Sequence, residues 1–173
     1  MKNIIHKYMF FLNAVFFLVF SLFQSPVFGQ YSLPNQRYKP QILPYVDSKL
    51  GDNSLKLMIA RTNYERAKGY MFYDEIASQT GMLFVFDQPH KMSFWMMNTK
   101  VPLDLVFFSE DLKVTEWIEN MAPGYGMHPS RLPHYSSKKD AKYALELKAG
   151  SIKELDIKIG DKLEIPLILL YCE

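Results

Sequence analysis

Two short apolar runs with a polar cluster between them constrain the fold of this chain more than any other feature. The runs are Met82 to Phe86 and Leu103 to Phe108. Both are too short to be buried helices and are rich in β-branched or aromatic residues, so they predict buried strands. Asn98, Thr99 and Asp104 lie between the runs or at their edge. Polar groups so close to a core are either bonded internally or available for binding.

Further short strands recur along the rest of the chain. They are expected at residues 55–59, 94–97, 113–118, 141–147 and 162–170. Thr62 with Glu65, and Ser151 with Glu154, have the spacing of capping boxes, which predicts two short helices. The pattern predicts a mainly β fold, a compact β-sandwich or partly closed barrel with two short helices.

The first 29 residues have the pattern of a secretory signal peptide. Two lysines precede an apolar run from Tyr8 to Phe23, and Val27 and Gly29 satisfy the small-residue rule before a cleavage site. We expect cleavage after Gly29 and an exported protein, either periplasmic or extracellular. Because the apolar run is shorter than the roughly 20 residues that span a bilayer, an uncleaved N-terminal membrane anchor is the alternative.

The remaining chain divides into an arm and one domain. Residues 30–53 contain three prolines and show no helical or alternating period, which predicts a linker or extended arm before a single β-rich domain at 54–173. The formal charge of +2 comes from the two lysines of the leader, so the mature domain has no basic stripe and nucleic acid is excluded as its main partner. Cys172 is the only cysteine, which rules out an intrachain disulfide and a cysteine-based zinc site.

The polar cluster between the strands supports two interpretations. An amide and a carboxylate, Asn98 and Asp104, can hold a sugar hydroxyl or a cation, with Trp95 as a stacking platform. Alternatively, Asn98 and Thr99 are turn residues, Asp104 bonds buried backbone amides, and Trp95 belongs to the core. Both interpretations stay open at the level of sequence.

The long loop at 120–139 contains His128 and His134, and loops of that length are often functional. No histidine spacing typical of metal sites is present, so we expect no metal. No phosphate loop or dinucleotide fingerprint appears, so we expect no cofactor. An enzyme that uses Asp104 or Glu146 as acid or base, together with these histidines, is the alternative to a binding module.

Five sequence blocks have a recognisable order. They are Gly69-Tyr70-Met71, Gly81 to Phe86, Trp95 to Asp104, Tyr143 to Gly150 and Gly160-Asp161. Together they resemble the family called Domain of Unknown Function 192, a small domain found widely in bacteria and archaea. The resemblance implies a mainly β, jelly-roll-like sandwich with short helices, and it implies no chemistry. Many relatives carry an arginine where this chain has Phe72 and Tyr73, which weakens any ion-pair role for Asp104 or Glu146.

We therefore expect an exported, non-catalytic binding or accessory module of the cell envelope. Its expected partner is a small molecule, a glycan or another envelope protein. The candidate ligand-binding residues are Trp95, Asn98, Thr99, Asp104, Glu146, His128 and His134.

Overall fold

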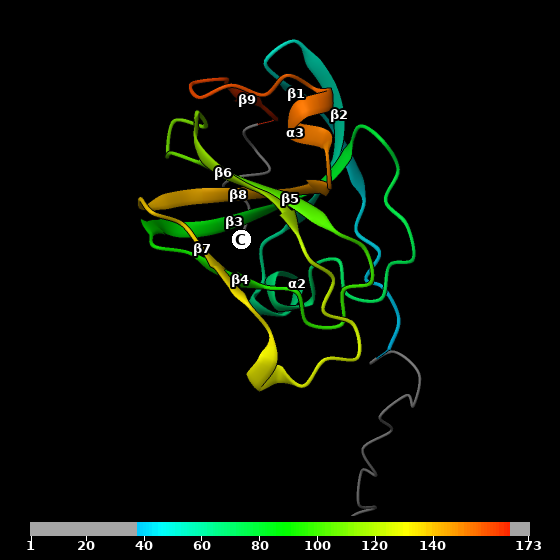
Figure 1. Cartoon of the computed structure of the whole chain (residues 1–173). Coiled ribbons are helices and arrows are strands. Elements are labelled where there is room, and N and C mark those ends of the chain that lie inside the picture. Colours follow the sequence, from blue (N-terminus) through cyan, green and yellow to red (C-terminus); the bar gives the residue numbers. More distant parts are fainter. Residues whose placement is uncertain (1–37, 167–173) are drawn as a thin grey trace, which may run out of the picture. The chain divides into compact units, whose positions relative to one another are not determined.

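The structure, a computed structural model, describes residues 38–166 (Figure 1). Its elements are β1 (Tyr45–Leu50), β2 (Asn53–Ala60), α2 (Asn63–Lys68), β3 (Thr80–His90), β4 (Ser93–Trp95), β5 (Leu103–Phe108), β6 (Val114–Met121), the 3-10 turn η2 (Pro129–Arg131), β7 (His134–Ser136), β8 (Ala141–Lys148), α3 (Ser151–Glu154) and β9 (Leu163–Glu164). The predicted signal peptide at 1–29, the start of the predicted arm and Cys172 lie outside the described residues. Between residues 38 and 166, no helix is both long and apolar enough to cross a membrane.

Seven strands form one curled half-barrel sheet in the order β6-β5-β8-β3-β2-β1-β9, and β4 pairs with β7 in a small second sheet. β8 lies at the centre because it pairs antiparallel with both β3 and β5. β2 and β3 run parallel, with α2 in the connection between them. Hydrogen bonds from Val114 to Asp161 and from Leu163 to Leu112 draw the two ends of the sheet together. The predicted mainly β, partly closed architecture is confirmed.

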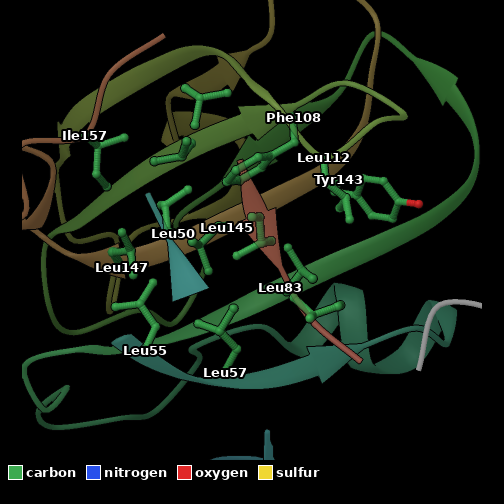
Figure 2. Packing of buried hydrophobic residues seen from close by; sticks show 14 of the residues in the cluster. Leu50, Leu55, Leu57, Leu83, Phe108, Leu112, Tyr143, Leu145, Leu147 and Ile157 are labelled. Atoms are coloured by element: carbon green, nitrogen blue, oxygen red, sulfur yellow. The ribbon is translucent and has the colours of Figure 1, made fainter. Parts of the chain in front are cut away.

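The two faces of the sheet carry two separate cores. Leu145 and Leu147 of β8 belong to one cluster (Figure 2). The same cluster includes Ile152 and Leu155 at α3. Ala144 faces the other cluster, because successive side chains of a strand point to opposite faces. Figure 1 shows α3 and β9 on one side of β5, β8 and β3, and α2, β4 and β7 on the other.

The two predicted capping boxes have different outcomes. Thr62 caps α2 as expected, since its hydroxyl accepts from the Glu65 amide at 3.1 Å and the Glu65 carboxylate accepts from the Thr62 amide at 2.9 Å. The box predicted at Ser151 is wrong. Gly150, in the left-handed region with φ 91°, precedes α3 instead, and Ser151 already belongs to its first turn without a side-chain cap.

Two predicted irregular segments contain strands. The predicted arm at 30–53 includes β1, which pairs along its whole length with β2, so the boundary at residue 54 is too late. Only Leu50 of β1 is buried, and the strand therefore lacks the apolar alternation that would have revealed it. The predicted loop at 120–139 contains η2 and β7, and β7 pairs with β4 in the small sheet.

Candidate functional site

A pocket of about 230 Å³ lies on the α2 side of the sheet. Its lining comes from α2 and the segment 69–71, from β3 and β8, and from β4 with the turn that follows it. A second hollow of about 400 Å³ lies against β1 and β2, but it contains none of the predicted site residues and no buried acid. The first pocket is therefore the candidate site.

Glu146 is the buried acid of this pocket. The sheet register places it between Met82 of β3 and Leu105 of β5, in the middle of an otherwise apolar face. Its side chain is 4% exposed, and its Oε2 has no hydrogen-bond partner among the described residues. Burial raises the pKa of Glu146 to about 8. The carboxyl group is therefore mostly protonated at neutral pH and offers one donor and one acceptor.

Tyr70 provides a second polar group in the same pocket. It directly follows Gly69, the residue that ends α2, and it is 2% exposed. Its hydroxyl also lacks a hydrogen-bond partner among the described residues. Burial, and secondarily the Glu146 carboxyl, raises the pKa of Tyr70. The pocket thus holds two buried polar groups that the protein itself does not satisfy.

The backbone at Gly69 passes close to the buried acid. A Cβ atom at this position would lie 3.5 Å from Glu146 Oε2, and Gly69 has a φ of 44°. The Gln41 side-chain amide donates to the Gly69 carbonyl at 3.0 Å and holds this turn in place. The end of α2 therefore fixes both the position of Tyr70 and the space above Glu146.

Aromatic rings form the rest of the wall. The rings of Phe84 and Phe94 meet edge to face with centroids 5.2 Å apart. Trp95 also lines the pocket and is 40% exposed, with its ring 6.3 Å from that of His134. The pocket therefore combines apolar walls, an exposed indole and a polar interior.

Two cationic side chains of α2 also line the pocket. The Arg66 guanidinium lies 4.7 Å from the centroid of the Phe86 ring, and the Lys68 ammonium lies 4.8 Å from that of Phe72. Burial lowers the pKa of Lys68. These contacts place positive charge against aromatic faces at the wall.

Three predicted site residues, Trp95, Thr99 and Glu146, line the pocket. Asn98 acts through the backbone instead: it lies in the left-handed region with φ 55°, and its carbonyl accepts from the Phe72 amide at 2.9 Å. The Thr99 carbonyl accepts from the amides of Gly124 and Tyr125 at 3.1 and 3.0 Å. Asn98 and Thr99 therefore form the turn that joins these segments, which is the structural interpretation of that pair.

Asp104 is not a residue of this pocket, and its prediction as a ligand-binding group needs correction. It pairs with Leu147 in the register and points to the face opposite Glu146. Its two oxygens accept from the backbone amides of Asn120 at 2.9 Å and Ile152 at 3.0 Å, and it is 1% exposed. Asp104 and Glu146 therefore cannot act as a pair of carboxylates.

The two loop histidines also lie outside the pocket lining. His128 caps η2 and contacts Ser130 at 2.8 Å, and His134 lies on β7 opposite Trp95. The predicted combination of Asp104 with both histidines is therefore not assembled at this pocket. The described residues contain no group of three or more His, Cys, Asp or Glu side chains suited to a metal ion.

Sequence reasoning missed Tyr70 and Phe94 as site residues. Tyr70 was visible in the block Gly69-Tyr70-Met71, and a tyrosine directly after a helix-ending glycine was the available signal. Phe94 carried no such signal, because its position depends on the pairing of β4 with β7.

Comparisons with known proteins give a family and two similar structures. The family model DUF192, described as Uncharacterized ACR, matches residues 46–165. A crystal structure described as a "putative transcription regulator" from Sinorhizobium meliloti 1021 shares 29% identity at a TM-score of 0.64, covering 72% of this chain and 98% of that one. A protein of unknown function from Novosphingobium aromaticivorans DSM 12444 shares 32% identity at a TM-score of 0.63, covering 70% and 86%. No curated protein matches.

Proposed function

This chain belongs to the DUF192 family, and we propose that it is an exported, non-catalytic module of the cell envelope that binds a small molecule in the pocket at Glu146 and Tyr70. The supporting observation is the pair of buried polar groups without partners. Each such group costs about 1–3 kcal/mol when it stays unsatisfied. A ligand that bonds both groups removes that cost, which gives the pocket a physical reason to be occupied.

One similar structure is described as a transcription regulator. The charge of this chain argues against applying that description to it. The charge excess comes from the leader, and no basic stripe remains to contact a phosphate backbone. The export part of the proposal rests on the signal-like pattern at residues 1–29.

A second candidate function, hydrolysis, rests on one contact between Ser93, which lines the pocket, and His134, which does not. Ser93 Oγ lies 3.4 Å from Nδ1 of His134, and both residues are exposed. Nucleophile–base pairs are usually about 2.6–3.2 Å apart and the base is oriented by a third group. Within residues 38–166, no carboxylate hydrogen bond to His134 is found that would orient the ring. If hydrolysis is the function, Ser93→Ala will remove turnover of a panel of simple esters, whereas a binding module shows none to remove.

Ligand binding is tested by thermal shift of the mature protein against a library of sugars, amines, carboxylates, peptides and lipid headgroups. At least one class is expected to raise the melting temperature, because a ligand that binds only the folded state stabilises it. Tyr70→Phe removes one of the two polar groups and should reduce the shift. Tyr64→Phe on α2, where the tyrosine is 66% exposed, is the matched control and should leave the shift unchanged. Absence of any shift across all classes contradicts the proposal.

Export is tested by expressing the full chain from its own N-terminus in a bacterial host. The mature protein is expected in the envelope or medium, and N-terminal sequencing should read from Gln30. Replacing two apolar residues of the 8–23 run with arginine is expected to retain the protein in the cytoplasm. A wild-type protein that stays in the cytoplasm with its first 29 residues intact contradicts this part of the proposal.

A further inference from the structure

We infer that the ligand of the Glu146 pocket is a small uncharged molecule with adjacent hydroxyl groups, of the size of one sugar ring or a short polyol. This inference rests on the proposed function, because it names the class of molecule that the same pocket binds. The hydrogen-bonding groups, the charges and the dimensions of the pocket each support it.

The two unsatisfied groups match a pair of hydroxyls. A protonated carboxyl group and a tyrosine hydroxyl each offer one donor and at least one acceptor. Each ligand hydroxyl can donate to one partner and accept from another in the same way. Both residues line the same pocket of about 230 Å³, and Glu146 Oε2 lies 3.5 Å from the position of a Cβ atom at Gly69, the residue before Tyr70, so one small molecule can reach both groups. Two neighbouring hydroxyls on one ligand therefore satisfy both groups.

The wall charges disfavour a cationic ligand. Arg66 and Lys68 both line the pocket, while the protonated Glu146 carries no compensating charge. A cation bound at Glu146 would have to displace its proton and would also face two positive side chains. The net field in the pocket therefore opposes an ammonium group.

An anionic ligand is disfavoured for a different reason. The guanidinium of Arg66 donates to the carbonyls of Arg61 and Val85 and to the side chain of Asn63, which uses three of its five N–H donors. Moving an anion from water into this buried region has a large desolvation cost, and an anion without donors leaves the acceptor atoms of Glu146 and Tyr70 unsatisfied. An uncharged ligand avoids both costs.

The dimensions favour one ring with an apolar face. A volume of about 230 Å³ is smaller than the roughly 300–1,000 Å³ of pockets for drug-sized ligands. It still exceeds several water molecules, each of which takes up about 30 Å³. The partly exposed Trp95 presents an aromatic surface on which the C–H face of a sugar ring can stack.

The test uses three probes that share one ring and differ only in charge: D-glucose, D-glucosamine and D-glucuronate. Each is titrated into the isotope-labelled mature protein at pH 6.5 and followed by NMR. Glucose is expected to shift signals of the pocket residues in a saturable way and to bind at least tenfold more tightly than the other two probes. Tyr70→Phe should weaken glucose binding about tenfold, and the exposed Tyr64→Phe should have no effect.

Two outcomes overturn the inference. Stronger binding of glucosamine or glucuronate than of glucose shows that the pocket selects a charge. Absence of saturable shifts with glucose, while other library members stabilise the protein, shows that the pocket binds a different class. In both cases the proposed binding function stands. A library without any stabilising member contradicts the proposed function itself, so the two failures are distinguishable.

Discussion

Replacing Asp104 with alanine is expected to lower the free energy of unfolding by about 3–5 kcal/mol. The carboxylate accepts from two backbone amides that come from different parts of the chain, at Asn120 and Ile152. Its removal leaves both amides without an acceptor next to a packed core, and hydrogen bonds to a charged group contribute about 1.5–3 kcal/mol each. Since total stability is typically about 5–15 kcal/mol, this single change removes a large part of it.

Urea denaturation followed by circular dichroism measures the loss. Asp140→Ala, at an exposed position before β8, is the matched control and should change stability by less than about 0.5 kcal/mol. Folded Asp104→Ala protein at low temperature should keep its ligand response, because Asp104 lies on the opposite face from the pocket. Unchanged stability together with loss of ligand binding would restore Asp104 as a binding residue and contradict its structural role.

The features predicted correctly depend on short stretches of sequence. β5 and β6 match the strands predicted at 103–108 and 113–118, and α2 follows from its capping box. The strand predicted at 141–147 is present as β8, and Tyr143, Leu145 and Leu147, which alternate along it, belong to one core cluster. In each case, residues within about ten positions of one another determine the outcome.

The features that were missed depend on pairing between distant segments. β8 pairs with β3 and β5, more than thirty residues away in sequence, and only this pairing surrounds Glu146 with Met82 and Leu105. The sequence window that contains Trp95 and Asp104 does not show which distant strands lie against each face. Period-two alternation around Leu103 and Leu105 assigns Asp104 to the other face, but the identity of the two cores emerges only from the assembled sheet.

The stability of the protein is expected to fall as the pH rises from about 5 to about 8, and Glu146 is the cause. Its pKa is about 8 in the folded protein against an ordinary value of 4.5, so the folded state holds a proton that the unfolded chain has released. The stabilising contribution is complete below pH 4.5 and is lost as the pH rises through the folded-state value. One pKa unit corresponds to about 1.4 kcal/mol, which gives a total loss of roughly 4–5 kcal/mol.

Glu146→Gln isolates this contribution, because glutamine keeps the shape of the protonated acid, still offers a donor and an acceptor, and does not titrate. Urea denaturation between pH 5 and 8.5 should show the wild type losing stability relative to the variant. Arg66, Lys68, Tyr70 and His90, which line the same pocket, are present in both proteins, so their effects cancel in the difference. Glu75→Gln, at an exposed position, is the control and should follow the wild type.

The affinity for a neutral ligand should also depend on the protonation of Glu146. A neutral ligand that accepts from protonated Glu146 binds the wild type more weakly above pH 8, whereas its affinity for Glu146→Gln stays constant across that range. Stability curves that run parallel for the two proteins would show that Glu146 is ionised and satisfied at neutral pH. The pocket would then present a fixed negative charge, and selection for an uncharged ring would lose its physical basis.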